Sequence, residues 1–331
     1  MTTHFVGIDI SAASLQVAID SKGKLWEGVF KNNAAGHKAL LKRLTKKGRR
    51  ARVVMEATAF YGLDLALALD NAVGVEVMVA NPRTLAAFAK ATAQRGKSDP
   101  LDARTLREFA QRMPFLPWQA PTTHALELRQ VMRRLHQLVH DRTQEKNRLH
   151  AAQSSEALPA VVVEDLQAHI AQLDARIERL EAAGLSVARA DVELCEKLGL
   201  LESIPGIGTR SGLHILGELC LLPSDMTVRQ WVAHAGLDPS PRQSGTSLKK
   251  SSRISKSGNR YLRHALYMPA LVSLRHNAHV KGFYEKLLSR GKAPKQAVVA
   301  IMRKLLHAIW GMFKSKQPFD ASRFYKMPET A

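Results

Sequence analysis

The order of strand-like and helix-like hydrophobic patterns in the first 120 residues constrains the fold more than any other feature of the chain. Three strand patterns joined by short turns come first, at residues 5–10, 15–19 and 25–30. Helical and strand patterns then alternate, at residues 36–44, 52–55, 61–69, 75–80 and 83–91. Consecutive strands with short turns predict an antiparallel meander, and strands separated by helices extend the same sheet. This segment therefore predicts a mixed α/β layer structure.

Helical patterns dominate the rest of the chain. A proline-rich break at residues 114–121 precedes a long helix at residues 123–152, and after Pro159 a second helix runs to residue 183. A later helix begins near Asn259, and Pro269 is expected to kink it. We predict a fold class of α/β plus all-α, in three parts: an α/β domain at residues 1–120, a helical spacer at 121–190 and a mainly helical domain at 191–331.

The second spacer helix carries a regular apolar seam. Its members are separated by alternating steps of four and three residues: Leu166, Ile170, Leu173, Ile177 and Leu180. This spacing is the a/d pattern of a heptad repeat. It fits a helical hairpin within one chain and also a coiled coil between chains. We favour self-association, into a dimer or a tetramer.

Four carboxylates in the first segment are candidates for a metal site. Asp9 lies within the first apolar strand, with the small Gly7 on its own side, and an acid there is costly unless it is paired or metal-bound. Glu56 ends the fourth strand pattern. Asp99 and Asp102 open a helix, and their spacing of three places both on one face. Oxygen ligands of this kind suit Mg²⁺, which commonly bridges carboxylates to phosphates.

Each of these acids also has a structural interpretation. Asp99 fits an N-cap followed by Pro100 at the first helical position, and Asp102 complements the positive end of the helix. Glu56 fits an ordinary acid at a strand end. Spacing alone does not prove that the four side chains converge.

Residues 240–266 combine hydroxyls with cations and contain no acid. The seven serines are Ser240, Ser244, Ser247, Ser251, Ser252, Ser255 and Ser257. The seven basic residues are Arg242, Lys249, Lys250, Arg253, Lys256, Arg260 and Arg263. Such a composition, with Gly245 and Gly258 freeing the backbone, suits a phosphate backbone. A disordered basic linker has a similar composition, but this stretch leads into an amphipathic helix, so we predict a functional loop held inside a folded domain.

The charge balance points to a polyanionic partner. The formal charge is +20, from 49 basic and 29 acidic residues, and residues 240–317 hold 17 Lys or Arg with Glu285 as their one acid. No run approaches the roughly 20 apolar residues that span a bilayer, and the N-terminus lacks the pattern of a signal peptide. Cys195 and Cys220 form neither a metal motif nor a disulfide framework. Nucleic acid is favoured over a membrane, in a reducing cytoplasm.

A second candidate phosphate contact lies in the C-terminal part. Apolar helices flank the sequence Ile-Pro-Gly-Ile-Gly at residues 204–208, which resembles a helix-hairpin-helix motif. Gly206 and Gly208 would let backbone N–H groups approach a phosphate, helped by the helix N-terminus that follows. The alternative is a tight helix connection with a glycine cap.

These motifs carry a resemblance to known families. A strand Asp, a strand-end Glu and a helical Asp pair resemble the ribonuclease-H or RuvC-like nuclease fold. The words GIDIS, MEATAFY, KSDPLDAR, IPGIG, HAGLDPSPRQSG, SKSGNRYLRHALYMPA and PFDASR resemble a bacterial transposase family, the DEDD recombinases of insertion-sequence family 110. The similarity spans roughly residues 4–324, with the motifs in order. One departure is Ala59, where the family usually has glycine after Glu-Ala-Thr.

The resemblance implies specific roles. Asp9, Glu56, Asp99 and Asp102 would bind one or two Mg²⁺ ions, and Ser244 would be the nucleophile, although chemistry alone does not choose among Ser240, Ser244, Ser247 and Ser251. The nucleic acid would be contacted by Arg242, Lys249, Lys250, Arg253, Lys256, Arg260, Gly206 and Gly208. The implied partners are donor and target DNA and a structured non-coding guide (bridge) RNA. The implied location is the bacterial cytoplasm, at the nucleoid, and the implied spacer is a coiled coil.

The expected activity is that of an RNA-guided DNA transposase, which cuts and rejoins DNA through a covalent phosphoserine. One alternative is a metal-dependent junction or R-loop nuclease that uses water as its nucleophile, with Ser244 as a phosphate contact. Another is a non-catalytic nucleic-acid-binding protein, against which the complete acid quartet argues. Apart from the family resemblance, no feature of the sequence separates serine attack from hydrolysis.

Overall fold

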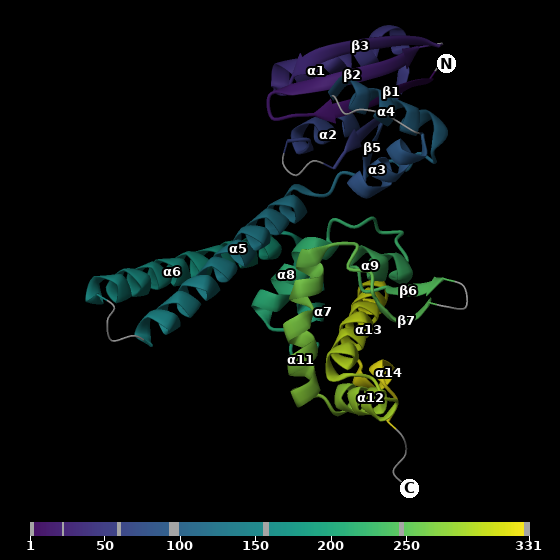
Figure 1. Cartoon of the computed structure of the whole chain (residues 1–331). Coiled ribbons are helices and arrows are strands. Elements are labelled where there is room, and N and C mark those ends of the chain that lie inside the picture. Colours follow the sequence, from purple (N-terminus) through teal and green to yellow (C-terminus); the bar gives the residue numbers. More distant parts are fainter. Residues whose placement is uncertain are drawn as a thin grey trace. The chain divides into compact units, whose positions relative to one another are not determined.

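The chain forms two compact units, Met1–Ala120 and Pro121–Ala331 (Figure 1). The computed structural model describes residues 3–21, 23–57, 61–92, 99–154, 159–244 and 248–327. Within these ranges the side chains of residues 21, 99–101, 241–244 and 248–252 are not described.

The first unit is built on a five-stranded mixed sheet with the order β3-β2-β1-β4-β5. Its strands are β1 (Thr3–Ile10), β2 (Ser14–Ser21), β3 (Lys24–Lys31), β4 (Arg50–Glu56) and β5 (Val75–Ala80). The first three pair antiparallel, which confirms the predicted meander. β4 pairs in parallel with β1, and β5 pairs in parallel with β4. The ends of β1, β3, β4 and β5 therefore lie at one edge of the sheet.

Helices cover both faces of this sheet. They are α1 (Ala34–Leu44), α2 (Leu63–Asp70), α3 (Pro82–Ala91) and α4 (Asp99–Arg112), with a short 3-10 helix, η1 (Lys46–Gly48). Leu40 of α1 and Leu65 of α2 pack with Ile8 in one core. Leu106 of α4 packs with Val54 in a second core. Because side chains alternate along a strand, these two cores lie on opposite faces of the sheet, and the mixed α/β prediction is confirmed.

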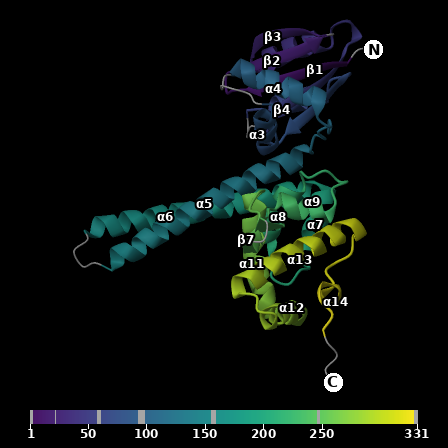
Figure 2. The ribbon, with the colours of Figure 1, turned by 45° about the vertical axis from the view of Figure 1, so that its right-hand side comes forward.

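The second unit begins with a long helical hairpin. In Figures 1 and 2, α5 (Thr123–Gln153) and α6 (Ala160–Ala190) run side by side in opposite directions. The predicted end of the second helix at residue 183 is wrong, because α6 continues through Gly184. A Cβ there would lie 2.3 Å from Cε of Met132 on α5. The glycine therefore serves close helix packing and does not end the helix.

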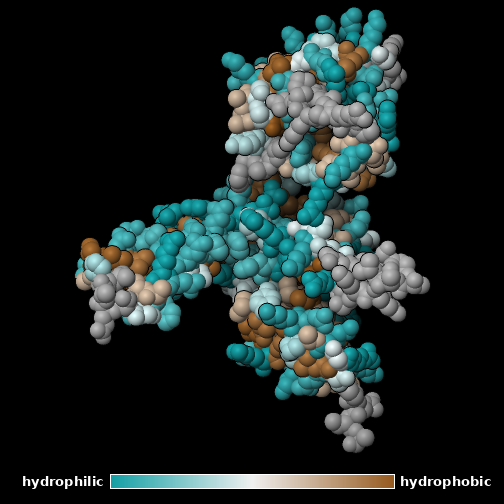
Figure 3. Space-filling view, viewed as in Figure 1, coloured by the Kyte–Doolittle hydropathy of each residue, from teal (hydrophilic) through white to brown (hydrophobic). Residues whose placement is uncertain are grey.

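Part of the heptad seam is buried inside this hairpin. Leu173 and Ile177 are buried against Leu138 of α5, and Leu180 packs on them. Leu166 and Ile170, nearer the start of α6, are only half-buried. Figure 3 shows hydrophilic side chains along most of the visible arm and apolar ones near its end, where Val161 is 67% exposed. The buried half of the seam thus takes the intramolecular alternative.

The remainder of the second unit packs many helices around one core. Its elements are α7 (Val192–Glu202), α8 (Thr209–Leu219), α9 (Val228–His234), β6 (Pro239–Ser244), β7 (Leu248–Ile254), α10 (Arg260–Ala265), α11 (Tyr267–His276), α12 (Ala278–Ser289), α13 (Pro294–Ser315) and α14 (Ala321–Phe324). Fully buried Leu213 and Leu216 of α8 belong to this core, as do Leu305 and Ile309 of α13. A mainly helical second part is thereby confirmed.

Two local predictions concern the segment from β6 to α11. The prediction of a loop from Ser240 to the helix near Asn259 is wrong, because β6 and β7 form an antiparallel hairpin within it. Its strands are polar and have no apolar alternation, so a hydrophobic period cannot reveal them. The helix near Pro269 breaks after Ala265. A proline ring clashes with the carbonyl four residues earlier, which here is the carbonyl of Ala265, the last residue of α10.

Candidate active site

Asp9 and Glu56 lie at the same edge of the sheet, in neighbouring parallel strands. Ile8 of β1 is in register with Met55 of β4. Asp9 and Glu56 are the next residues of these two strands, so they are level with each other. Ile8 and Met55 are both buried under α1 and α2. Because successive side chains alternate, Asp9 and Glu56 both belong to the opposite face. Neighbouring strands are about 4.8 Å apart, so the register places these two carboxylates side by side.

α4 covers that face at very close range. A Cβ atom on Gly7 would lie 2.1 Å from the main-chain oxygen of Ala103 and 2.2 Å from the amide nitrogen of Arg107. Both are main-chain atoms, so a larger residue could be accommodated only if the helix moved. Gly7 is thus the residue that lets α4 rest on β1, two positions before Asp9.

Two ion pairs hold α4 on the meander. The Arg104 guanidinium donates two hydrogen bonds of 2.6 Å to the Glu27 carboxylate, and these bonds are the main reason that the pKa of Glu27 is lowered. Arg107 contacts Asp20 at 3.4 Å. Sequence reasoning did not identify Glu27 and Asp20, since their partners lie 77 and 87 residues away.

The same ion pairs show that α4 runs antiparallel to β1. Glu27, the partner of Arg104, is level with Gly7 across the sheet. Asp20, the partner of Arg107, is level with Phe5, which is two positions nearer the start of β1. The first turn of α4, which ends with half-buried Asp102, therefore lies toward the end of β1 that carries Asp9.

Three of the four predicted acids are thus brought to one edge and one face of the sheet. The fourth, Asp99, is the first residue of α4, and its side chain is outside the described residues. Ala59 also lies outside them. Among the side chains that the structure describes, no group of three or more His, Cys, Asp or Glu is close enough to hold a metal ion.

In the second unit, Ser244 is the last residue of β6 and pairs with Leu248 of β7. The main chain also pairs Arg242 with Lys250 and the residue after Arg242 with Lys249. The side chains of these residues lie outside the described set. The hairpin therefore carries the predicted serine at the end of β6 and four of the predicted cations, Arg242, Lys249, Lys250 and Arg253, on its strands.

The base of this hairpin is fixed by backbone and side-chain hydrogen bonds. The Ser255 amide donates to the carbonyl oxygen of Asp238 at 2.9 Å, and its hydroxyl bonds to the Asp238 carboxylate at 2.5 Å. Next to it, a Cβ on Gly258 would lie 2.2 Å from the carbonyl oxygen of His234. Exposed Lys256 has a φ of 52°, in the left-handed region. These contacts fix the course of the main chain from the end of β7 to the start of α10.

Glu218 is the buried centre that joins this path to the helical core. Its carboxylate accepts bonds of 2.7 and 2.9 Å from Arg133 of α5 and one of 2.6 Å from the Asn259 side chain. The Asn259 oxygen in turn accepts from the amides of Tyr261 and Leu262, which caps α10. Burial alone would lower the pKa of Arg133, but the bonds and charge of Glu218 outweigh it and raise that pKa. Sequence reasoning did not identify Glu218, because its partners lie 85 and 41 residues away.

The predicted cations at the base are on the surface. Arg253 of β7 and Arg260, the first residue of α10, flank the exposed Lys256 in sequence, and Arg253 is itself exposed. The Arg260 guanidinium lies 5.0 Å from the ring centre of Tyr261. Beside this ring, His136 lies 4.6 Å from His264, ring centre to ring centre.

The two glycines of the Ile-Pro-Gly-Ile-Gly turn have different surroundings. Gly206 has a φ of 98°, and its missing side chain would meet the amide nitrogen of Ser273 on α11 at 2.8 Å. Gly208 caps α8 and has no atom within 4 Å of its missing Cβ. The turn joins α7 and α8, as predicted. Gly206 is required by packing on α11, whereas Gly208 is open to an approaching group.

Comparison with known proteins places these features in a family. Residues 6–154 match a transposase family defined by DEDD acids and the insertion element IS110, and residues 198–285 match the transposase IS116/IS110/IS902 family. The chain belongs to the IS110 family of transposases. This chain is a DNA transposase or recombinase, with DNA as its substrate.

Individual relatives cover different parts of the chain. The pilin gene-inverting protein of Moraxella bovis is 29% identical over 329 residues, which are 97% of this chain and 98% of that protein. An uncharacterised 42 kDa protein of insertion element IS900 from Mycobacterium paratuberculosis is 29% identical over 52% of this chain and 42% of its own length. A putative transposase of Sinorhizobium fredii is 40% identical over 25% of this chain and 22% of its own length.

A DEDD transposase family implies a divalent metal ion, and three of the predicted acids are residues of a type that binds one. Asp9, Glu56 and Asp102 supply hard carboxylate oxygens, which are the donors that such ions prefer. They are held at one sheet edge by strand register and by the contact of α4 with Gly7.

In the part of the chain that the structure describes, no helix is both long and apolar enough to cross a bilayer.

Proposed function

We propose that this protein is an RNA-guided recombinase of an insertion sequence, and that it cuts and rejoins DNA through a covalent bond to Ser244. The observation that carries the proposal is the β1–β4 register, which sets Asp9 beside Glu56 under the helix that carries Asp102. A bound Mg²⁺ would offset the charge that develops on the scissile phosphate. Asp9, Glu56, Asp99 and Asp102 would hold one or two such ions.

The serine would provide the covalent step. The Ser244 oxygen bonds to phosphorus while the bond from phosphorus to the 3′ oxygen breaks. The serine loses its proton and the released 3′ oxygen gains one. The 5′ end remains attached as a phosphoserine, which conserves the energy of the phosphodiester, so a new 3′ hydroxyl can attack and rejoin the strand without ATP.

The basic surface would hold the nucleic acids. Arg242, Lys249, Lys250, Arg253, Lys256 and Arg260 lie on the hairpin and at the start of α10, where they would bind phosphates, with Gly208 as a further backbone contact. A guide RNA that pairs with donor and target DNA would choose the sequence, leaving the protein to bind backbone and shape. The acids and the serine come from different units, and we propose that chains act as dimers or tetramers.

Ser244→Ala tests the covalent step. The variant should bind DNA and RNA as the wild type does, yet form neither cleaved product nor covalent adduct, because the attacking oxygen is gone. The measurement is denaturing electrophoresis with labelled element-end DNA and its RNA. Ser251→Ala, in β7 of the same hairpin, is the control and should form the adduct. Continued cleavage by Ser244→Ala, with 5′-phosphate products and no adduct, would establish the hydrolytic nuclease instead.

Replacing Lys249 and Lys250 together with alanine tests the basic surface. Affinity should fall about equally for all DNA sequences, and the slope of log affinity against log salt should become shallower by about 0.9 for each lost duplex phosphate contact. The control pair is Lys46 and Lys47 of η1, two exposed lysines before the start of β4 and so at the sheet edge opposite the acids. An unchanged slope in the hairpin variant would exclude phosphate contacts by these lysines.

A further inference from the structure

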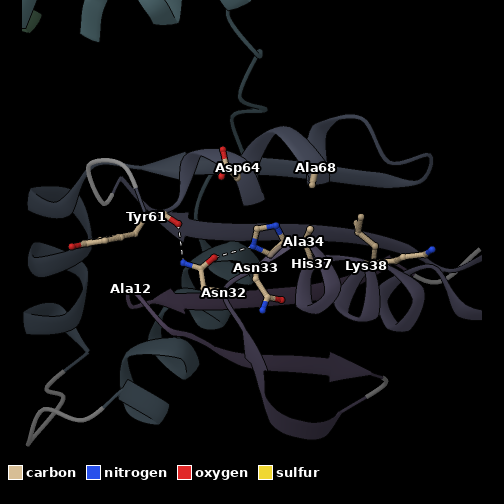
Figure 4. Close-up of a pocket in the computed structure, with 10 residues that line it drawn as sticks. Ala12, Asn32, Asn33, Ala34, His37, Lys38, Tyr61, Asp64 and Ala68 are labelled. Carbon is tan, nitrogen blue, oxygen red and sulfur yellow. Dashed lines mark hydrogen bonds between the residues drawn. The ribbon is translucent and has the colours of Figure 1, made fainter. Parts of the chain in front are cut away.

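A cavity of about 600 Å³ lies on the α1 and α2 side of the sheet, at the edge where β1, β3 and β4 end. Figure 4 shows Asn32, the residue after β3, between Tyr61 and His37 at this cavity. The Asn32 amide nitrogen donates to the carbonyl oxygens of Ser11, at 2.8 Å, and Tyr61, at 3.0 Å. One side chain thus ties together two segments that are 50 residues apart in sequence.

These two segments follow the two acid-bearing strands. Ser11 comes two residues after Asp9, and Tyr61 comes five residues after Glu56. Carbonyl oxygens accept hydrogen bonds but cannot donate them, so Ser11 and Tyr61 cannot bond to each other through these atoms. A donor with two N–H groups is needed between them. Asn32 supplies that donor from a third strand end at the same edge.

His37 fixes the orientation of this amide. Its Nε2 lies 2.9 Å from the Asn32 side-chain oxygen. Since both Asn32 N–H groups are directed to carbonyls, that oxygen must accept, and Nε2 of His37 must donate. His37 is only 7% exposed, so packing within the core holds the imidazole in place. The Asn32 main-chain amide also donates to the carbonyl of Ala13 at 2.9 Å.

We infer that Asn32 is a positioning residue for the metal-binding acids, because it fixes the spacing of the main chain after Asp9 and after Glu56. This inference rests on the proposed metal site. Residues that do not bind the metal but orient its ligands typically change metal affinity by about 10–100-fold when they are replaced. Asn32 acts in this way on the backbone of both ligand segments, from the face of the sheet opposite the carboxylates.

The test is the affinity of the full-length protein for Mn²⁺ alone, measured from the free-ion signal in electron paramagnetic resonance. Asn32→Ala should weaken binding by about 10–100-fold. The matched control is Asn33→Ala. Asn33 is the next residue, its side chain caps α1 by accepting from the Gly36 amide, and it also lines the cavity. This control should lower the Tm and leave Mn²⁺ affinity within about twofold of wild type, because the Asn33 side chain bonds to the first turn of α1, whereas the bonds to Ser11 and Tyr61 come from Asn32.

Asp9→Asn separates failure of this inference from failure of the proposed site. If Asp9→Asn leaves Mn²⁺ binding unchanged, the metal site itself is wrong. If Asp9→Asn abolishes binding while Asn32→Ala matches wild type, the site stands and the role of Asn32 is refuted. Equal weakening in Asn32→Ala and Asn33→Ala would also refute it, because loss of stability would then explain both. Should Asn32→Ala not fold, His37→Phe, which removes the donor to Asn32, must still weaken binding at least about threefold for the inference to hold.

Discussion

Replacing Gly7 with alanine should abolish DNA cleavage and destabilise the first unit by about 3 kcal/mol, at the upper end of the usual cost of overpacking. The added methyl group would lie 2.1 and 2.2 Å from main-chain atoms of α4, so α4 must move off β1. Because α4 carries Asp99 and Asp102, the change separates them from Asp9 and Glu56. Urea unfolding and the cleavage assay measure the two effects.

Gly311→Ala is the matched control. Gly311 lies inside α13, and no atom lies within 4 Å of the position that its Cβ would take. Alanine there should leave cleavage unchanged and raise the free energy of unfolding by about 0.5–1 kcal/mol, because glycine is the less favourable residue within a helix. Wild-type stability and cleavage in Gly7→Ala would show that α4 does not rest on β1 as described.

Removing the buried carboxylate of Glu218 should have the second large effect. Glu218→Ala leaves the Arg133 guanidinium, whose side chain is 33% exposed, without its bidentate partner, and it removes the carboxylate that accepts from the Asn259 amide. Breaking a buried ion pair by removing one partner costs about 3–5 kcal/mol. The second unit should lose that much stability in urea unfolding, and amide hydrogen exchange at Tyr261 and Leu262 should accelerate as the cap of α10 loosens.

Glu285→Ala is the control for this change. Glu285 pairs with Lys281 at 3.9 Å on the surface, where the two side chains are 60% and 65% exposed, and exposed pairs contribute at most about 1 kcal/mol. A loss of no more than that is expected. If Glu218→Ala were equally mild, with unchanged exchange at α10, Glu218 would not be the residue that holds the hairpin base in place.

Local patterns in the sequence were sufficient for most of the elements. Strand and helix periods in the first 120 residues identified every strand of the sheet, because each strand either packs one apolar face on a core or, like β4, is a short apolar run buried on both faces. The polar strands β6 and β7 have no such period and were missed. The end of α6 was misplaced because Gly184 is a packing glycine, and a glycine within a helix resembles a terminating one in sequence.

Residue type and local position identified the candidate acids, since Asp9 interrupts an apolar strand and Asp102 opens a helix. Their placement at one edge of the sheet depends on contacts between distant segments: the pairing of β1 with β4, the antiparallel course of α4, and the contact of α4 with Gly7. Asn32 and Glu218 stayed hidden for the same reason. Their partners are 21, 29, 41 and 85 residues away, and a local period carries no information on which distant groups a polar side chain will meet once the chain has folded.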